Sequence, residues 1–489
     1  MSMAGFNPVA SAREAVEALE ALHARSVAAL RGAMEASIRT GAAPDAATRA
    51  LFRYPELRVT YAPGGSEPDN RRAFAKFPAP GVYVTTVTHP KAFAPYLVEQ
   101  LRPLIEEYGA RVEVGPGSQE IPYPYVFESG DELARGESTA GELARLFPSP
   151  LLSDVGDEVA DDLYEHRPDE PRPLALFDAV RVDFSLRRIV HYTGSDWRSV
   201  QPWILLTNYH RYVDQFVAFG LERLRDPADP IEKLVLPGDV VVDASMDAET
   251  ARAAVERVQW HRYQMPAYHA VTKDRQGVTL VNIGVGPSNA KTMTDHLAVL
   301  RPNCWLMVGH CGGLRRSQAI GDYVLAHAYL RQDGILDRLV PPETPIPALA
   351  EVQVALQDAA RQVTGDEGEA LKRRLRTGTV VTYADRNWEL RWSRERRRIN
   401  LSRAIAVDME SATVATQGFR MRVPYGALLC VSDKPLHGEI KLPGAANAFY
   451  ERAVSEHLRI GLAALDLLKR RREGLHSRKL RSFDEPPFR

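Results

Sequence analysis

The chain has 489 residues and a formal net charge of −1, from 62 lysines and arginines against 63 aspartates and glutamates. A chain of this length is expected to form two or three domains, each with its own core. Because a charge near zero gives no overall field for nucleic acid or an anionic membrane, the composition favours a small-molecule partner.

The first part of the chain predicts a small α+β unit. An amphipathic helix is expected over residues 12–38, strands at 58–61 and 82–88, a helix near 92–108 and a strand at 111–114. The strands and helices do not alternate simply, so the pattern does not indicate half of a dinucleotide-binding fold.

Residues from about 130 to 173 are acidic and hold neither a helical nor a strand period, which predicts an irregular connection. We therefore expect an N-terminal α+β domain over residues 1–180 and a second domain over 181–489. The exact boundary is expected within residues 175–225.

The second domain alternates strands and helices, which is typical of an α/β layer fold. The expected strands are 280–283, 304–308, 323–326, 379–383, 404–407 and 427–431, and the expected helices are 288–300, 347–363, 410–419 and 446–470.

Several features predict a cytoplasmic protein with no membrane partner. No apolar run approaches the ~20 residues of a membrane span. Glu14, Glu17 and Glu20 make the first helix unlike a secretory signal. The three cysteines lack the spacing of a disulfide or metal pair. Two basic stretches, 391–398 and 469–481, are interrupted by glutamate, so no nucleic-acid partner is expected.

Four short motifs follow predicted strands in the second domain. They are GVGPSNA at 284–290, GHCGG at 309–313, VDMESA at 407–412 and VSDK at 431–434. Open α/β sheets bind ligands at the carboxyl ends of their strands. The four motifs therefore predict a single ligand site.

In this order and spacing, the motifs resemble the nucleoside phosphorylase and nucleosidase superfamily over about residues 230–470. The similarity is strongest to the AMP nucleosidases and extends over nearly the whole chain, including YTG at 192–194, TNY at 207–209 and EPPFR at 485–489. The resemblance implies a nucleoside-phosphorylase-like α/β catalytic domain with an N-terminal α+β regulatory domain. It also implies hydrolysis of AMP to adenine and ribose 5-phosphate, in purine salvage and control of adenylate levels.

Asp433 is expected to be the general acid. A carboxyl group at a strand end can be partly desolvated and keep its proton near neutral pH. Adenine leaves poorly unless N7 is protonated as the glycosidic bond breaks. The resemblance places the superfamily's catalytic aspartate at this position; an aspartate that caps the following turn is the alternative.

Met409 and Glu410 are expected to contact the ribose. By resemblance, Glu410 accepts hydrogen bonds from the 2′- and 3′-hydroxyls. A fixed anion there would also stabilise the positive charge of an oxocarbenium-like transition state. The alternative is a first-turn glutamate favoured by the helix dipole.

Two glycine-rich loops are expected to line the site. Gly286 and Gly312 allow close backbone approach, and Ser288 and Asn289 begin a helix whose N–H groups can face an oxyanion. Tight turns alone are the alternative.

His310 stands where related phosphorylases carry a small hydroxyl residue, and Met307 stands where they carry an arginine. These departures remove ligands for inorganic phosphate and so predict water as the nucleophile. The alternative for His310 is a satisfied core histidine.

Arg386, Lys434 and Lys441 are candidate cations for the 5′-phosphate, with His210, Arg211 and His437 as further possibilities. Each can instead be a solvated surface charge. Trp388 is a candidate to stack on adenine, with core packing as an equal alternative.

No metal or organic cofactor is expected for catalysis. By resemblance, MgATP activates the enzyme allosterically, phosphate inhibits it, and the chain forms a homohexamer. Two alternatives remain open: a nucleosidase or phosphorylase of unphosphorylated purine nucleosides, and a non-catalytic nucleotide-sensing protein. The presence of both Asp433 and Glu410 disfavours the latter.

Overall fold

The computed structural model describes residues 5–62, 72–127, 140–439, 445–475 and 480–489. The chain forms two compact units, one of Met1–Arg187 with Arg481–Arg489 and one of Arg188–Leu480. Residues 481–489 were expected in the second domain, whereas in the structure they belong to the N-terminal unit.

The N-terminal unit is built on a five-stranded sheet in the order β1-β4-β2-β3-β5. Its strands are antiparallel except for the β3–β5 pair. The strands are β1 (Asn7–Val9), β2 (Arg53–Tyr61), β3 (Gly81–Thr86), β4 (Arg111–Glu120) and β5 (Arg172–Pro173). The helices are α1 (Ala12–Thr40), α2 (Ala46–Arg49), α3 (Ala94–Glu106), α4 (Ala140–Leu146) and α5 (Ala179–Thr193). The predicted α+β unit is confirmed.

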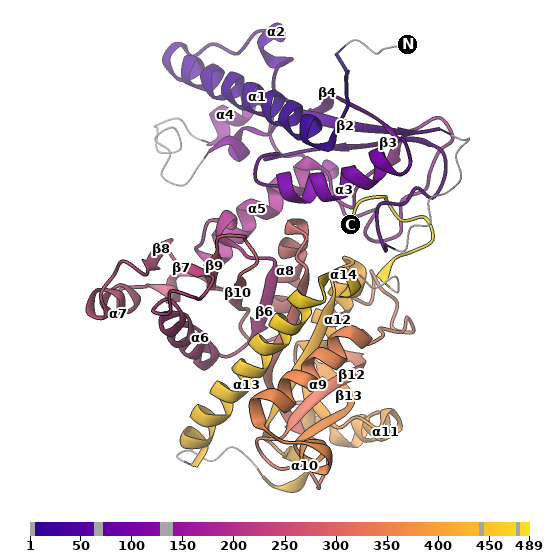
Figure 1. The fold of residues 1–489 in the computed structure, drawn as a ribbon. Helices are drawn as coiled ribbons and strands as arrows, with labels where there is room; N and C mark the ends of the chain where they lie inside the picture. Colours follow the sequence, from indigo (N-terminus) through magenta and orange to yellow (C-terminus); the bar gives the residue numbers. More distant parts are fainter. Residues whose placement is uncertain (1–4, 63–71, 128–139, 440–444, 476–479) are drawn as a thin grey trace. The chain divides into compact units, whose positions relative to one another are not determined.

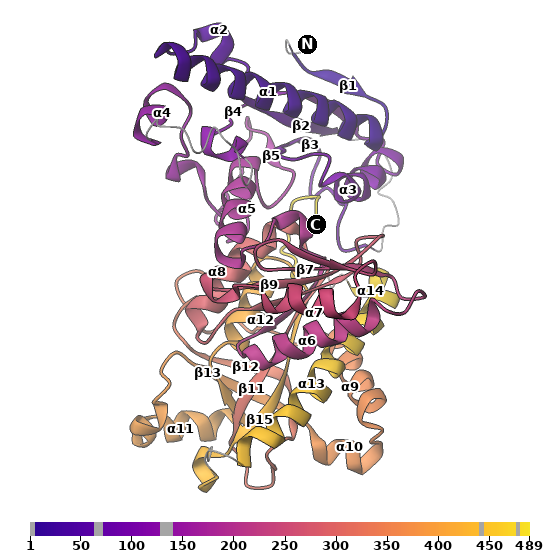
Figure 2. The ribbon, with the colours of Figure 1, turned by 90° about the vertical axis from the view of Figure 1, so that its left-hand side faces the viewer.

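Helix α1 lies along this sheet (Figures 1 and 2) and contacts β2 and β4. It begins at Ser11, whose hydroxyl accepts a hydrogen bond from the Glu14 N–H, and it ends at Gly41 in the left-handed conformation. Both ends carry the caps that these residue types favour. Its apolar face places Val16 and Leu19 in the core.

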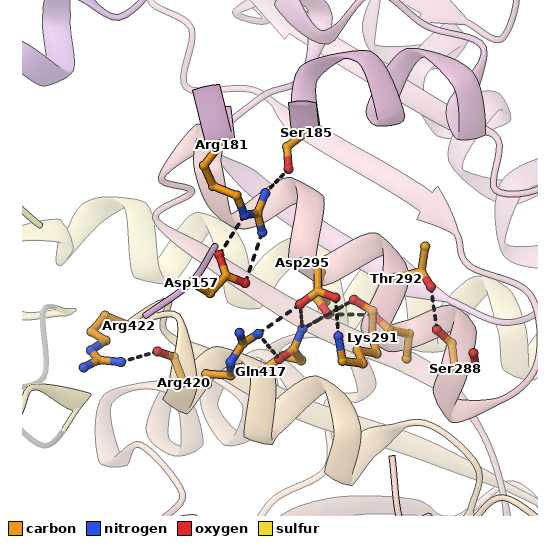
Figure 3. A network of polar contacts seen from close by, with 12 residues as sticks. Asp157, Arg181, Ser185, Ser288, Lys291, Thr292, Asp295, Gln417, Arg420 and Arg422 are labelled. Atoms are coloured by element: carbon orange, nitrogen blue, oxygen red, sulfur yellow. Dashed lines mark hydrogen bonds and ion pairs between the residues drawn. The ribbon is translucent and has the colours of Figure 1, made fainter. Parts of the chain in front are cut away.

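The described part of the acidic segment is largely irregular, as the sequence predicted. It holds α4, a short 3₁₀ turn at Leu152–Asp154 and β5. Within this unit Arg181, on α5, forms an ion pair with Asp157 at 2.7 Å and a hydrogen bond with Ser185 (Figure 3). The acidic segment is therefore anchored to α5.

The second unit contains a ten-stranded sheet in the order β14-β13-β12-β15-β11-β6-β10-β9-β7-β8. Strand β14 also pairs with β11, so β11, β15, β12, β13 and β14 close on themselves as a small barrel. The strands are β6 (Trp203–Thr207), β7 (Ile231–Leu236), β8 (Val240–Asp243), β9 (Ala267–Thr272), β10 (Val278–Asn282), β11 (Cys304–Gly313), β12 (Tyr323–Gln332), β13 (Leu375–Tyr383), β14 (Ala406–Asp408) and β15 (Tyr425–Asp433).

Helices cover both faces of this sheet. The Trp305 indole N–H on β11 donates to the Val414 carbonyl on one side, while Val308 packs against Gly461 on the other. Side chains of odd and even residues of a strand point to opposite faces. The helix that carries Val414 and the helix that carries Gly461 therefore lie on opposite faces of the sheet. The helices are α6 (His210–Arg223), α7 (Ala248–Glu256), α8 (Pro287–Leu297), α9 (Ala350–Thr364), α10 (Gly368–Arg374), α11 (Trp392–Ser402), α12 (Ser411–Arg420), α13 (Ala445–Arg470) and α14 (Arg472–Leu475).

Every strand and helix that the sequence predicted in this unit is present, most with ends shifted by a few residues. The largest differences are extensions of strands: β11 continues to Gly313 and β12 to Gln332. Both extensions belong to the small barrel. In β11 the extension includes the GHCGG motif, which therefore lies within the strand.

Candidate active site

The motifs meet where strands of the small barrel end. Strand β11 lies between β15 and β14, and Gly312 is in register with both Asp433 and Val407. An added Cβ at Gly312 would lie 3.0 Å from Val407, so only glycine fits between these strands without displacement. The VSDK and VDMESA motifs are thereby held on either side of GHCGG.

Glu410 joins this group to the GVGPSNA loop. Its side chain is 1% exposed, and Oε1 accepts a hydrogen bond from the Gly286 N–H at 2.6 Å while Oε2 accepts one from Asn208 Nδ2 at 2.8 Å. Gly286 adopts φ 116°, a backbone conformation that residues with a side chain rarely adopt, and its N–H faces the carboxylate. Met409, the preceding residue, is half-buried.

A second buried carboxylate, Asp408, lies at the end of β14. It accepts hydrogen bonds from the Thr382 hydroxyl at 2.5 Å and, at 2.7 Å, from the N–H of Ser411, the first residue of α12. Burial raises the pKa of Glu410 above its usual range, and the adjacent Asp408 charge raises it further. Burial likewise raises the pKa of Asp408, while its hydrogen bonds oppose that shift.

The helices that follow Gly286 and Glu410 are tied together by Asp295 on α8 (Figure 3). Its carboxylate contacts Lys291 Nζ at 2.5 Å, Gln417 Nε2 at 2.6 Å and Arg420 at 3.0 Å. Gln417 and Arg420 belong to α12. Because α8 begins directly after Gly286 and α12 directly after Glu410, this network fixes Gly286 relative to Glu410.

Asp433 ends β15 and is half-buried. One of its oxygens, Oδ1, accepts a hydrogen bond from the Ser432 hydroxyl at 2.7 Å. Its register with Gly312 puts this carboxyl at the same strand ends as the Glu410 turn.

His310 is half-buried at the end of β11, enclosed by the start of α6. Its ring makes an edge contact with Tyr209 at 5.1 Å between centroids. Tyr212 Oη lies 3.5 Å from His310 Nε2 and 2.6 Å from His457 Nδ1. Cys311 is buried beside it, and all three cysteines are free thiols.

The helix start at Ser288 and Asn289 makes local contacts. Ser288 is exposed and its carbonyl accepts the Thr292 hydroxyl, while Asn289 Nδ2 lies 3.5 Å from the Val285 carbonyl. These contacts lie along the first turn of α8.

The candidate cations for the 5′-phosphate differ in their surroundings. Lys434 is buried and its ammonium contacts Glu439 at 2.6 Å and the Arg316 carbonyl at 3.2 Å. Arg386 is exposed. Lys441 lies outside the described residues.

Trp388 packs in a core cluster with Val381 and Ile399 and stacks on Tyr383 at 5.9 Å. Its burial favours the core-packing alternative over stacking on a base.

Three features of the candidate active site were not identified from the sequence. Asn208 stands in the TNY segment but had no assigned role, and Asp408 and the Tyr212–His457 pair were not considered. Asn208 follows a wholly apolar strand, β6, which is the kind of strand-end position that the other motifs occupy. Strand β6 was not predicted, so this signal was missed.

Within the described ranges, no group of three or more His, Cys, Asp or Glu side chains is arranged to hold a metal ion. Among the same residues, no helix combines the length and apolarity that a membrane span requires.

Two family descriptions match separate parts of the chain. Residues 14–171 match "Bacterial AMP nucleoside phosphorylase N-terminus", and residues 243–466 match "Phosphorylase superfamily". Among solved structures, a crystal structure of AMP nucleosidase from Bacteroides thetaiotaomicron VPI-5482 is 29% identical, covering 59% of this chain and 98% of that one with a TM-score of 0.42.

Full-length relatives are more similar. AMP nucleosidases of Escherichia coli K12 and O157:H7 are each 56% identical over 478 residues, which covers 97% of this chain and 98% of theirs. A uridine phosphorylase of Thermococcus kodakarensis is 25% identical over 133 residues, 26% of this chain and 48% of its own. With both halves matched and the whole length aligned, the chain belongs to the AMP nucleosidase family.

Proposed function

We propose that this enzyme hydrolyses the N-glycosidic bond of AMP to give adenine and ribose 5-phosphate. The observation that carries the proposal is the buried Glu410 carboxylate, fixed by the Gly286 N–H and Asn208 at the strand ends where Asp433 also lies. The end-to-end similarity to relatives named AMP nucleosidase supports the choice of AMP.

In this mechanism, Glu410 accepts hydrogen bonds from the ribose hydroxyls and Met409 packs against the sugar. As the bond from C1′ to N9 breaks, positive charge develops on the ribose, and the Glu410 carboxylate stabilises it more than it stabilises the ground state. The Gly286 N–H and the Asn208 amide already hold the Glu410 carboxylate in place, so this group needs little reorganisation as the bond breaks.

Asp433 would act as the general acid, donating a proton to N7 of adenine so that the base leaves neutral. Water then bonds to C1′. The glycine-rich loops at Gly286 and Gly312 let the backbone lie close to the sugar. Catalysis by these groups requires no metal or organic cofactor.

A second candidate is phosphorolysis, because both matched family descriptions carry the word phosphorylase. His310 and Met307 stand in place of the phosphate ligands of such enzymes, which favours water. Incubating the full chain with AMP or adenosine, each with and without phosphate, separates the candidates. Hydrolysis gives adenine from AMP without phosphate, whereas phosphorolysis requires phosphate and gives a sugar 1-phosphate.

The N-terminal α+β unit is proposed to regulate the enzyme in the cytoplasm, with MgATP as activator and phosphate as inhibitor of a homohexamer. The catalytic unit contains all four motifs, so the N-terminal unit is not needed for the chemistry itself. A separate domain of that size is best explained by control or assembly. Sedimentation equilibrium and AMP saturation curves with MgATP test these two roles.

A further inference from the structure

Lys434 follows Asp433 directly, so the contacts that fix Lys434 also constrain the backbone of the proposed general acid. The residue is 4% exposed, and lysine is rarely buried to this extent unless it is paired. A buried ammonium group is stable only where a counter-charge and hydrogen-bond acceptors replace water. The partners of Lys434 therefore indicate its role.

The Lys434 ammonium has two acceptors, both from its own chain. Nζ lies 2.6 Å from Glu439 Oε1 and 3.2 Å from the Arg316 carbonyl oxygen. The Glu439 side chain is half-exposed, whereas that of Lys434 is buried. An incoming phosphate would have to displace Glu439 in order to pair with this ammonium.

The side chains of Lys434 and Asp433 leave the chain on opposite faces. Asp433 is in register with Gly312 on β11. The space beside the next residue, Gly313, is occupied by Lys434, since an added Cβ there would lie 3.3 Å from Lys434 Cγ. Consecutive residues of a strand face opposite sides, so the ammonium is directed away from the face that carries the Asp433 carboxyl group.

The ion pair closes the turn of residues 434–439, which begins directly after β15. The Lys434 N–H donates to the Glu439 carbonyl at 2.7 Å, and the His437 N–H donates to the Lys434 carbonyl at 3.0 Å. Gly438 adopts φ 74°, in the left-handed region that glycine favours. The backbone and the side chain of Lys434 are therefore both bonded to Glu439.

The position of this turn matters because proton transfer depends on distance. A general acid must lie within hydrogen-bond reach of the atom that it protonates, about 2.6–3.2 Å. A misplacement of about 1 Å can lower the rate on the order of 10²-fold. Asp433 is the last residue of β15, so the sheet holds it on its N-terminal side and the turn holds it on the other.

We propose that Lys434 is a positioning residue: its ion pair with Glu439 holds the turn after β15 and thereby places the Asp433 carboxyl group for proton transfer to N7 of adenine. This inference rests on the proposed hydrolysis of AMP. It gives Lys434 no contact with the substrate, in place of the 5′-phosphate contact for which the sequence made it a candidate.

The first test uses Lys434→Met, which keeps an unbranched side chain of similar length and removes the ammonium. The kcat for AMP and the Kd for ribose 5-phosphate are measured for this variant and for the full-length wild type. We expect kcat to fall roughly tenfold, with the Kd changed by less than about twofold. This split distinguishes a displaced acid from a lost phosphate ligand.

The second test asks whether Lys434 acts through Asp433. In Asp433→Asn the proton donor is absent, so the position of this side chain no longer affects proton transfer. Adding Lys434→Met to Asp433→Asn should therefore cause no further loss in kcat, whereas independent effects would multiply. A general loss of structure would lower kcat in both backgrounds.

Glu439 variants test the same pair from its half-exposed side, where a substitution leaves the core intact. Glu439→Gln keeps an oxygen that can accept from the ammonium, so it should retain more activity than Glu439→Ala. Lys469→Met is the matched control, because Lys469 also forms an ion pair, with Asp466 at 3.2 Å, but lies on α13. It should leave kcat unchanged.

Three outcomes overturn the proposal. The first is wild-type kcat in a folded Lys434→Met protein or, should that variant not fold, in Glu439→Ala. The second is a weaker Kd for ribose 5-phosphate with kcat preserved, which would make Lys434 a phosphate ligand. The third is a multiplied loss in the Asp433→Asn background. If the wild type does not hydrolyse AMP, or Asp433→Asn is as fast as the wild type, it is the proposed function that fails instead.

Discussion

At the scale of single residues, the electrostatics of the site centre on Glu410. Its burial and the neighbouring Asp408 both raise the pKa of this carboxyl group. The Gly286 N–H and the Asn208 amide oppose that shift because they donate to the ionised form. Hydroxyl donors on a ribose would favour the ionised form further, so substrate binding and ionisation of Glu410 should be linked.

The first prediction concerns pH. The ribose hydroxyls of AMP donate to the ionised form of Glu410. The kcat/KM for AMP should therefore fall as the pH drops through the raised pKa of Glu410. Asp408→Asn removes the neighbouring negative charge, lowers the pKa of Glu410 and moves this acid limb to lower pH. A pH profile of kcat/KM measures the shift.

Asp466→Asn is the control, because Asp466 pairs only with Lys469 at 3.2 Å among its described contacts and lies on α13. Its profile should match the wild type. An acid limb that stays in place or moves to higher pH in Asp408→Asn would show that Asp408 does not act on Glu410.

The second prediction concerns the ribose contact. Glu410→Gln keeps the shape of the side chain but removes the charge, so kcat should fall more than KM rises. For the same reason 2′-deoxy-AMP should be a poor substrate for the wild type. Steady-state kinetics with both nucleotides test this, and equal kcat/KM values would argue decisively against a 2′-hydroxyl contact.

Glu410 and Asp433 were singled out by their place at strand ends together with the superfamily resemblance, and their catalytic roles stay predictions. The side-chain partners were not predictable, because they come from elements distant in the sequence: Asn208 is 202 residues from Glu410, and His457 is 245 residues from Tyr212. Nor does the sequence show that Lys434 is engaged by Glu439, which makes a phosphate role less favourable.

At the scale of elements, the C-terminal segment Arg481–Arg489 behaves as part of the N-terminal core. Phe488 is 1% exposed within the same cluster as Leu57 and Leu101. Its backbone N–H donates to the Leu174 carbonyl at 3.0 Å, and the Ala75 N–H donates to the Pro487 carbonyl at 2.7 Å. The Arg489 carbonyl accepts the Tyr96 hydroxyl at 2.8 Å.

The third prediction follows from this packing. Phe488→Ala should destabilise the N-terminal unit by about 3–5 kcal/mol, because truncating a buried phenylalanine leaves a cavity. Denaturant unfolding followed by hydrogen exchange in α1 and β2 measures the loss. Phe483→Ala is the matched control, since Phe483 lies in the same segment and is fully exposed. Similar stability of the two variants would mean that the segment does not contribute to this core.

The periodicity of the sequence predicted most of the helices and strands, since each buries one face or lies wholly inside. It did not predict the location of the C-terminal segment, which has no regular period and is held by backbone hydrogen bonds and one aromatic anchor. Strands β6 to β9 were also not among the predicted strands.

At the scale of the whole molecule, we propose that one compact unit carries out catalysis and the other regulates it. The Arg188–Leu480 unit holds all four motifs and the contacts of the candidate site that the structure describes. The N-terminal unit has its own sheet and core, which supports the separate regulatory role that we propose for it.

The fourth prediction separates the units. MgATP should lower the apparent KM for AMP in the full chain, and a shortened chain of residues 175–480 should keep basal cleavage but lose this response. Coupling of the usual ~1–3 kcal/mol would change AMP affinity by roughly 5- to 150-fold. AMP saturation curves with and without MgATP measure it.

An unchanged response in the shortened chain would place the effector site in the catalytic unit. Loss of all cleavage in a folded shortened chain would mean that the N-terminal unit supplies active-site residues or assembly contacts.

The rate of adenine release from AMP in phosphate-free buffer, by the full chain and by Asp433→Asn, tests the proposed hydrolysis. We predict that the wild type releases adenine and ribose 5-phosphate in equal amounts. The amide keeps the shape of the carboxyl group without its proton, so Asp433→Asn should bind AMP normally and be slower by on the order of 10²–10⁴-fold. A folded Asp433→Asn protein that releases adenine at a near-wild-type rate would show that Asp433 is not the general acid.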